Sequence, residues 1–285
     1  MVRRGRAGFT LVEAIVALTL SSVLVILVGT TFLVQNRYYA VQVERSAAQD
    51  NARMVTEMIA SEIRSLMASG VVTAENHRLV VRSPMALALV CSKLTGQRYS
   101  VYMEGGDTLI DTSEVGGIAM LNADGTWTYS DDVWPNFFLA KHAAGYCSAN
   151  GADTVGAGDE FIDMKKLDKM FGLDPAVGQV LMVYRKVEYS FGPSGLDPST
   201  VALFRRLVGG SAVEFATGMD TSSQFMYRRA GGKFTGDYVT SVGSTELGAI
   251  DAIRIEAEVR RAIKSVQADD VTFGWAVNVP LRNAR

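Results

Sequence analysis

Glu13 is the residue of this 285-residue chain whose type and position point most directly to chemistry. It stands in the segment AGFTLVEAIVALTL, residues 7–20, which carries no other charged side chain. A carboxylate inside an apolar, membrane-like segment is costly to desolvate and therefore marks a functional position. The alternative is that Glu13 sits at the edge of a membrane and extends its carboxylate toward water.

An uncharged run of 21 residues, from Ala14 to Val34, follows the acid. About 20 apolar helical residues cross the hydrocarbon core of a bilayer, so the run predicts one transmembrane helix. Arg3, Arg4 and Arg6 precede this run without any acid, and the positive-inside rule then places the basic N-terminal segment in the cytoplasm.

A secretory signal peptide is the alternative interpretation of this apolar run. The run is longer than a normal h-region and ends without an A-x-A cleavage site, so we expect the segment to be retained.

The same helix continues beyond the membrane. No proline precedes Pro84, and Gly29 is the only glycine between Phe9 and Ser69. Because nothing interrupts it, this stretch predicts one continuous helix of about 60 residues and about 90 Å. Ser69 and Gly70 predict its end.

The second half of this helix is amphipathic. Apolar side chains recur there at intervals of three and four residues, which predicts one buried stripe: Val55, Met58, Ile59, Ile63, Leu66 and Met67. Glu57, Glu62 and Arg64 fall off this stripe.

From Val71 onward the pattern changes to short alternating segments between glycine-rich and polar turns. HRLVVRS and QRYSVYM are candidate strands, and QVLMVYRKVEYSF with TVALFRRLVGG predicts a β-hairpin joined by GPSGLDPS. IRIEAEVRR alternates apolar and charged residues, which is typical of a half-buried antiparallel strand, and VTFGWAVNVPLRN is its expected partner. Residues from about 104 to 178 are rich in Gly, Asp and Asn and predict an irregular insertion with a short helix near DMKKLDKMF.

These elements predict an α+β protein in which a long N-terminal helix packs on an antiparallel β-sheet. Residues 1–8 form a basic leader, 9–34 a transmembrane helix and 35–69 an amphipathic stalk. Residues 70–285 form an external β-rich domain, with the loop-rich insertion at about 104–178.

The two cysteines, Cys91 and Cys147, both fall in the external part. In an oxidising compartment they can pair, which closes a loop worth roughly 4 kcal/mol in the chain-entropy model. Two buried free thiols are the alternative, because the sequence does not show how far apart they lie.

No other cluster predicts catalysis, a cofactor or a metal. His77 and His142 stand in unrelated contexts and form no zinc spacing with the cysteines. Asp153, Asp159 and Glu160 lack the spacing of a calcium loop. GGSAV at 209–213 stops short of G-x-S-x-G, and GGK at 231–233 lacks the remainder of a P-loop. We therefore expect no enzymatic activity.

Charge argues against a nucleic-acid partner. Without the three leader arginines the chain has 25 Lys+Arg against 30 Asp+Glu, a net charge of −5. Three arginine pairs offer the opposite interpretation, a DNA-binding patch: Arg205–Arg206, Arg228–Arg229 and Arg260–Arg261. Neighbouring residues of a strand point to opposite faces, so we expect each pair to be split.

The segment GFTLVE, Gly8 to Glu13, follows a short basic leader and precedes an apolar helix. It resembles the prepilin cleavage and methylation motif of type IV pilins and of type II secretion pseudopilins. The resemblance implies that a prepilin peptidase cuts between Gly8 and Phe9 and methylates the new amine of Phe9. A small residue such as Gly8 lets a protease approach the backbone closely.

The resemblance also gives Glu13 a role in assembly. It implies that the Glu13 carboxylate meets the Phe9 amine of a neighbouring subunit, or its own, when the helix leaves the membrane. A carboxylate among packed apolar helices is severely penalised, and a nearby cation offsets that cost and fixes the register of the helices.

Later segments resemble PilW-like minor pilins and the J-type minor pseudopilin. The stalk sequence DNARMVTEMIASEIRSLMASG is similar to theirs, and three short strand motifs follow in the same order: Val187-Glu188-Tyr189, Leu203-Phe204-Arg205 and Leu281-Arg282-Asn283. Many major pilins carry a proline midway along the membrane helix, where this chain has only Gly29. The chain is also long for a major pilin, which favours a minor subunit.

The resemblance implies a single-pass protein of a bacterial inner membrane whose globular domain is periplasmic and which later enters a filament, at its tip or in an initiation complex. Its expected partners are a prepilin peptidase, other pilins, an inner-membrane assembly platform and the lipid bilayer. The alternative is a membrane-anchored periplasmic binding module or enzyme with a chance N-terminal match. The sequence does not separate a type IV pilus from type II secretion or DNA uptake.

Overall fold

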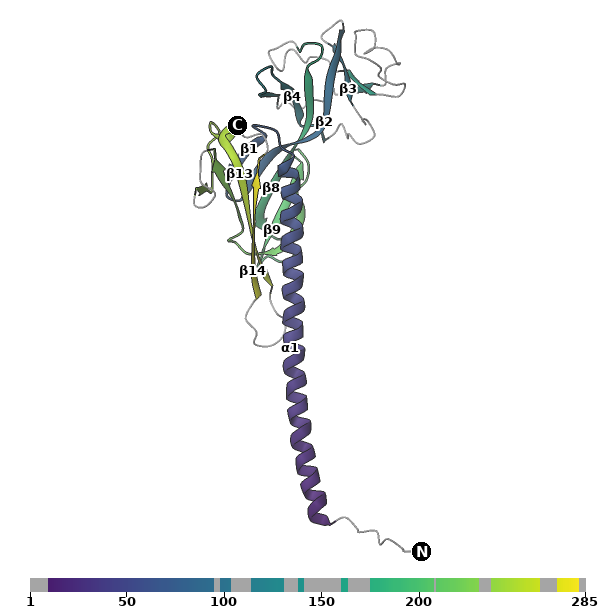
Figure 1. The fold of residues 1–285 in the computed structure, drawn as a ribbon, viewed down its shortest axis with the longest axis vertical. Coiled ribbons are helices and arrows are strands. Elements are labelled where there is room, and N and C mark those ends of the chain that lie inside the picture. The colour runs from purple at the N-terminus through teal and green to yellow at the C-terminus, as the bar shows by residue number, and fades with distance from the viewer. Residues whose placement is uncertain are drawn as a thin grey trace.

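The computed structural model describes residues 10–94, 98–103, 114–130, 138–140, 160–163, 175–207, 209–230, 237–261 and 271–281. A single long helix, α1 (Leu11–Arg64), carries a β-rich domain on its C-terminal part (Figure 1). This is the predicted α+β arrangement. The N-terminal half of the helix extends away from the domain without touching it.

Helix α1 runs for 54 residues without a break, including at Gly29. At about 1.5 Å per residue this is about 80 Å. Its last residue is Arg64, and Ser65 is the C-cap: the Ser65 backbone N–H donates to the Glu62 carbonyl and the Leu66 N–H to the Ile63 carbonyl, each at 3.1 Å. Gly70 follows in the turn, and a Cβ there would lie 2.9 Å from the Met67 carbonyl oxygen, which only glycine avoids. The observed end of the helix at Arg64 thus lies five residues before the predicted end at Ser69.

The strands of the described residues form one hydrogen-bonded sheet. Their order along the main path is β12-β11-β13-β10-β9-β8-β2-β3-β7-β6, with β1 beside β2, β14 beside β13, and β4 between β5 and β8. Their bounds are β1 Val71–Glu75, β2 Arg78–Leu94, β3 Arg98–Met103, β4 Gly117–Leu121, β5 Trp127–Ser130, β6 Phe138–Ala140, β7 Glu160–Asp163, β8 Val180–Pro193, β9 Val201–Leu207, β10 Val213–Met219, β11 Gln224–Arg229, β12 Tyr238–Val239, β13 Ile250–Arg261 and β14 Val271–Pro280.

Two predicted strand pairs are confirmed. Strands β8 and β9 form the antiparallel hairpin, with Val187 opposite Leu207 and Pro193 opposite Val201. Strand β14 is the antiparallel partner of β13 along its whole length. The apolar residues of β13 are buried as their alternation predicts: Ile253, Ile255, Ala257 and Val259.

The insertion predicted at about 104–178 is not wholly irregular. Strand β4 pairs with the first half of β8 and with β5, and β7 pairs with β3 and β6. These are short strands of three to five residues. Such segments carry too few residues to show a period of two, and their structure comes from the long strands beside them. The helix expected near DMKKLDKMF falls mostly outside the described residues.

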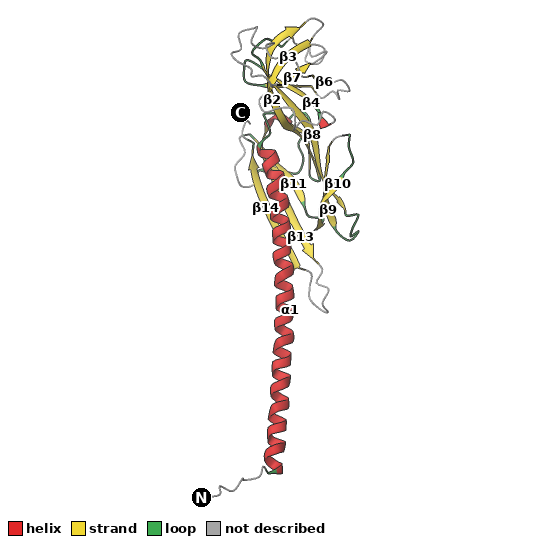
Figure 2. Cartoon of the chain, turned by 90° about the vertical axis from the view of Figure 1, so that its right-hand side faces the viewer, coloured by secondary structure: helices red, strands yellow, loops and turns green. Residues whose placement is uncertain are grey.

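Strands β2 and β8 are long enough to take part in two regions of the sheet (Figures 1 and 2). The second half of β2 and the first half of β8 form an upper region with β3 and β4, beyond the end of α1. Their other halves join β9 and the strands that lie beside α1. A register shift between Pro84 and Ala86 of β2 marks the transition between the two regions.

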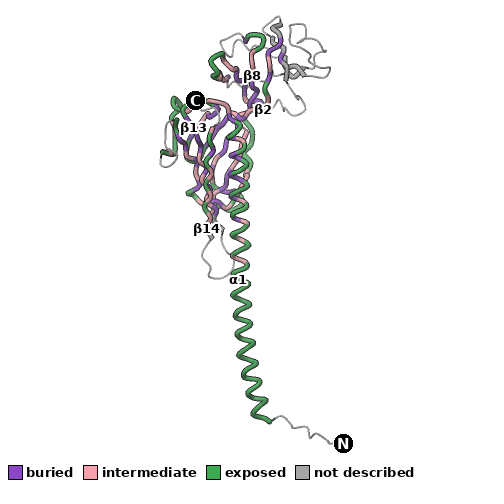
Figure 3. The backbone as a smooth tube through the Cα atoms, viewed as in Figure 1, coloured by how far each residue is buried: buried purple, intermediate pink, exposed green. Residues whose placement is uncertain are grey.

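Figure 3 shows that one face of the C-terminal part of α1 is buried against the sheet, and its residues differ in part from the predicted stripe. Val55, Ile59, Ile63 and Leu66 are buried as predicted and join the main core cluster with residues of β8, β11 and β13. Met58 is 47% exposed, so its assignment to the stripe is wrong. Four small residues complete the buried face instead: Ala48, Ala52, Thr56 and Ala60.

Small residues at this face let the helix approach the sheet closely. Ala48 and Ala52 form a cluster with Val259 of β13, and Phe273 and Trp275 of β14 pack against it. Full burial of the helix against the sheet therefore begins at Ala48, and the residues just before it are half-buried or exposed.

The outer face of the sheet holds a buried acid, Glu188, whose side chain is 8% exposed. Arg78 and Arg206 contact its two carboxylate oxygens at 2.9 and 2.8 Å. Burial by itself raises the pKa of the Glu188 carboxyl, but the hydrogen bonds and charges of the two arginines outweigh burial and hold the pKa below its usual value.

This arrangement predicts a pH-dependent loss of stability. A carboxyl whose pKa is lower in the folded state stabilises the fold above its unfolded pKa of about 4.3, and that contribution is lost as the pH falls. We expect Glu188→Gln to lower the midpoint of thermal unfolding, followed by circular dichroism, at neutral pH, and the difference from the native chain to shrink below about pH 4. Glu57→Gln, at an exposed carboxylate, serves as control. A difference that stays constant across this range would contradict the assignment.

Candidate functional site

The first turn of α1 holds Glu13 in a reciprocal contact with Thr10. Thr10 is the N-cap residue: its hydroxyl accepts a hydrogen bond from the Glu13 backbone N–H at 3.3 Å. Oε2 of Glu13 accepts hydrogen bonds from the Thr10 backbone N–H and from its hydroxyl, each at 3.0 Å. This is a capping box, which satisfies amide groups that the helix itself leaves without acceptors.

The capping box was missed in the sequence, although its signal was present. Thr10 and Glu13 have the T-x-x-E spacing of the motif and stand directly before the apolar run. The contact gives Glu13 a local role that needs no partner molecule. The hydrogen bonds from Thr10 use one carboxylate oxygen, so the second oxygen can still face a cation.

The apolar half of α1 is exposed on all sides. Its large apolar side chains are each at least half exposed, from Leu11 at 78% to Val34 at 51%. Among the described residues, α1 is the one helix that is long and apolar enough to cross a membrane. Exposing an apolar surface of this size to water is unfavourable, whereas in a bilayer the same surface contacts hydrocarbon.

The hydroxyl side chains of this segment are compatible with a hydrocarbon environment. Four of its hydroxyls donate a hydrogen bond to a carbonyl oxygen three or four residues earlier: those of Thr19, Ser22, Thr30 and Thr31. The helix thereby satisfies its backbone and these four hydroxyl groups internally, which suits a membrane segment.

Several predicted site residues fall outside the description. Gly8, Phe9, Cys147 and His142 belong to this group, so the cleavage site stays a prediction. Cys91 of β2 is disulfide-bonded, and Cys147 is the second of the two cysteines in the sequence. The described residues contain no group of three His, Cys, Asp or Glu side chains placed to hold a metal ion.

The described arginines of the suspected DNA-binding patch are paired with acids instead. Neighbours in sequence turn to opposite faces, and each meets its own carboxylate: Arg205–Glu62 at 3.5 Å, Arg206–Glu188 at 2.8 Å, Arg228–Asp251 at 2.8 Å and Arg229–Glu246 at 3.0 Å. These four side chains therefore form no continuous positive surface.

A second polar site, around Glu62, was not predicted. Its side chain is 14% exposed and accepts a hydrogen bond from the Tyr189 hydroxyl. Burial raises the pKa of Tyr189, and the neighbouring Glu62 carboxylate raises it further, so the phenol stays protonated and donates. Arg185 and Arg205 approach Oε1 of Glu62 at 3.7 and 3.5 Å. No local pattern reveals this site, because these three partners lie more than 120 residues from Glu62 along the chain.

Comparison with known protein families gives one match. The model of the prokaryotic N-terminal methylation motif matches residues 3–29. The matched range contains Gly8, Phe9, the capping box and most of the predicted membrane span. No curated protein and no solved structure matches the chain. The match supports a type IV pilin-like protein that is processed at its N-terminus.

The capping box makes a prediction about the first turn of α1. Thr10→Val keeps the shape of the side chain but removes the hydroxyl, which typically costs a helix about 1 kcal/mol. We expect the Glu13 amide to exchange its hydrogen several-fold faster in this variant, measured by NMR on the full chain in lipid nanodiscs. Thr10→Ser, which retains the hydroxyl, should exchange like the native chain. Equal protection in all three would show that the box does not stabilise the turn.

Proposed function

We propose that this chain is a minor subunit of a type IV pilus or of a type II secretion pseudopilus, similar to PilW-like minor pilins or the J-type minor pseudopilin. The observation that carries the proposal is the coincidence of two features. The methylation motif covers residues 3–29, and the same residues lead into a helix whose apolar half touches nothing in its own domain. A filament built from packed apolar helices provides the surface that this half lacks.

Processing by a prepilin peptidase is the first step of the proposed function. The peptidase hydrolyses the bond between Gly8 and Phe9 with water, and then transfers a methyl group from a separate methyl-donor cosubstrate to the Phe9 amine, which loses a proton. Before cleavage the chain stays in the inner membrane through α1, with its globular domain in the periplasm. After cleavage the new positive amine is the only charge near Glu13 within the apolar segment.

The charge on Glu13 then sets the register of assembly. Moving a carboxylate from the membrane edge into a bundle of apolar helices is unfavourable unless a cation meets it. The Phe9 amine of a neighbouring subunit, or of the same chain, supplies that cation. The hydrogen bonds from Thr10 orient the carboxylate while leaving one oxygen for the amine. In this proposal the chain acts as a structural subunit and not as an enzyme, and its site is the helix surface.

Mass spectrometry of the mature N-terminus tests the processing step. We expect a chain that begins with N-methylated Phe9 in cells that contain a prepilin peptidase. Gly8→Val should retain the leader, because the peptidase loses its close approach to the backbone. Gly5→Val, at the other leader glycine, should be processed normally. A mature start at another residue, or an intact leader on the native chain, would contradict the proposal and leave a membrane-anchored module as the better description.

The role of Glu13 in assembly is tested separately. We expect Glu13→Val to insert into the membrane normally and to be processed. Its incorporation into filaments should fall at least about tenfold, because leaving one partner of a buried ion pair alone costs roughly 3–5 kcal/mol. Immunoblots of sheared filaments and of the membrane fraction measure both quantities. Glu57→Val, at an exposed acid of the same helix outside the apolar segment, is the control. Normal incorporation of Glu13→Val would exclude the charge-pairing mechanism.

A further inference from the structure

Strand β14 (Val271–Pro280) forms a free edge of the sheet within the part of the chain that the structure describes. It pairs with β13 on one side along its whole length, without a register shift. Figures 1 and 2 show β13 and β14 running alongside the C-terminal part of α1. The other side of β14 presents the unpaired backbone groups of an edge strand, which a further strand can bind.

One hydrogen bond shows which backbone groups of β14 face outward. Directly after the strand, the Leu281 N–H donates to the Asp251 carbonyl of β13 at 2.8 Å. Successive residues of a strand direct their N–H and C=O groups to opposite sides, so the odd-numbered residues of β14 bond to β13 and the even-numbered ones face away. These residues direct their carbonyls outward, and all but the proline also direct an N–H outward: Thr272, Gly274, Ala276, Asn278 and Pro280. A proline in a sheet is tolerated at such an outward position of an edge strand.

This edge lacks the features that usually prevent the binding of a further strand. Edge strands are commonly short, charged or bulged. The segment VTFGWAVNVP carries no charge, its ladder with β13 has no bulge, and Pro280 blocks only its last position. The other edge strands in the described part of the sheet have only two to five residues: β12, β6, β5 and β1. Among these edges, β14 is therefore the long and unprotected one.

Gly274 lies in the middle of this edge, and its own domain gives no reason for a glycine. Its φ is outside the left-handed region, and a Cβ at this position would meet no described atom within 4 Å. A glycine inside a strand weakens the strand. It often marks a place where another backbone approaches closely, which an added strand would provide.

The side chains of β14 indicate what kind of strand fits beside it. Phe273, Trp275 and Val277 are half-buried on the side of α1, and the two aromatic rings pack against the cluster of Ala48 and Ala52. Apolar side chains of an added strand, at every second position, would cover these rings further. The opposite side of β14 presents small, uncharged and exposed side chains: Thr272, Gly274, Ala276 and Asn278. The edge therefore fits an uncharged strand that is apolar on the side of α1.

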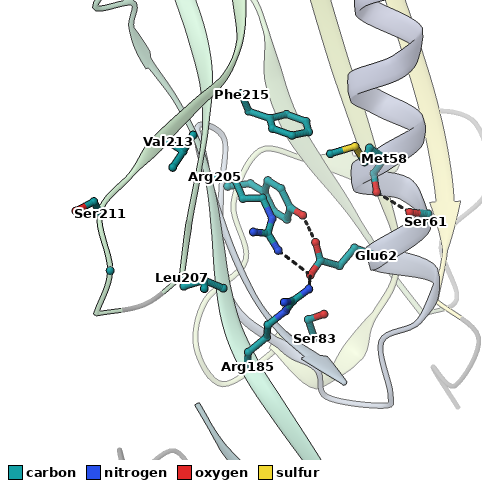
Figure 4. Close-up of a pocket in the computed structure, with 12 residues that line it drawn as sticks. Met58, Ser61, Glu62, Ser83, Arg185, Arg205, Leu207, Ser211, Val213 and Phe215 are labelled. Carbon is teal, nitrogen blue, oxygen red and sulfur yellow. Dashed lines mark hydrogen bonds and ion pairs between the residues drawn. The ribbon is translucent and has the colours of Figure 1, made fainter. Parts of the chain in front are cut away.

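The cavity beside Glu62 offers no comparable set of free groups (Figure 4). It has a volume of about 620 Å³ and opens where the last turns of α1 meet β8, β9 and β10. Its charged groups face one another, because Glu62 lies between Arg185 and Arg205. These side chains hold the helix against the sheet, and they select no particular ligand.

We propose that the free edge of β14 binds an extended strand of a different protein, which joins the sheet through backbone hydrogen bonds. The partner strand carries apolar residues at alternate positions, on the side of α1. A second copy that paired its own β14 antiparallel would point its α1 in the opposite direction, so both copies could not be anchored in one membrane. That exclusion rests on the proposed membrane anchor. The binding of a strand does not depend on cleavage at Gly8, so either proposal can fail without the other.

Hydrogen exchange tests whether the edge is free. It is measured by NMR on the full chain in lipid nanodiscs. We expect the outward amides of Thr272, Gly274 and Ala276 to exchange at least about tenfold faster than the amides of Trp275 and Val277, which bond to β13. Equal protection of the two sets would show that another part of this chain, or a second copy, already covers the edge, and would overturn the proposal.

An N-methylated peptide tests the binding of a strand. The probe is an acetylated and amidated heptapeptide of alternating threonine and valine whose valines carry N-methyl groups, so that one of its edges is blocked and it cannot stack on itself. Its threonine N–H groups remain free to pair with β14, which places the valines on the side of α1. We expect it to bind with a Kd in the millimolar range and to slow the exchange of the Gly274 and Ala276 amides.

Two control peptides separate backbone pairing from other contacts. The same peptide with N-methyl groups on every residue should not bind. A peptide that is methylated on its threonines instead places its valines on the side away from α1, and should bind at least about tenfold more weakly. Equal binding of the fully methylated peptide, or no binding of the first probe, would overturn the proposal. Equal binding of the threonine-methylated peptide would overturn the placement of the apolar side chains.

A matched pair of variants connects the binding to β14. Ala276→Pro removes one outward N–H, at a side of the strand that already holds Pro280, and should weaken the probe at least about tenfold. Ala276→Val retains the N–H and should bind like the native chain. Unchanged binding in Ala276→Pro would overturn the proposal. The comparison of peptides needs no variant, so it remains decisive where Ala276→Pro disrupts the strand.

Discussion

The rest of the structure depends on one constraint: a single unbroken helix must satisfy two different surroundings. The backbone of α1 and four hydroxyl groups of its first half are satisfied within the helix, which lowers the cost of placing that half in hydrocarbon. From Ala48 onward the same helix buries a narrow face of small and aliphatic residues against the sheet. Because no proline or chain break intervenes, the position of the domain fixes the position of the apolar half.

Glu13 has two roles at the start of the helix, one within its own chain and one in the proposed assembly. Its contact with Thr10 explains why an acid is tolerated there in a single chain, because the carboxylate completes the N-terminal cap. The proposed pairing with the Phe9 amine, of a neighbouring subunit or of the same chain, gives the acid a second role. The two are compatible, since the cap occupies one carboxylate oxygen. Capping holds the carboxylate in a defined place before its proposed partner, the Phe9 amine, is released.

Long periodic elements could be predicted from the sequence, and sites built by the tertiary structure could not. Helix α1, the β8–β9 hairpin and strand β13 each carry enough residues to show their period. Met58 was misassigned because its spacing fits a stripe, whereas close packing selects Ala48 and Ala52, whose small size carries little signal. Strands β4 and β5 depend on β8. The Glu62 site forms only because the fold brings together α1, β8 and β9, so no local pattern marks it.

The central claim, that one helix passes from lipid to protein without a break, is tested most directly by spin-label accessibility. Single nitroxide labels are placed along α1 of the full chain in nanodiscs, and their collisions with oxygen and with a water-soluble nickel complex are measured. The account predicts high oxygen and low nickel accessibility on every face from Ala14 to Val34. From Ala48 it predicts an oscillation with the helical period of 3.6, lowest at Ala48, Ala52 and Ile59. Nickel access to any face of the first segment, or protection of one face throughout, would contradict it.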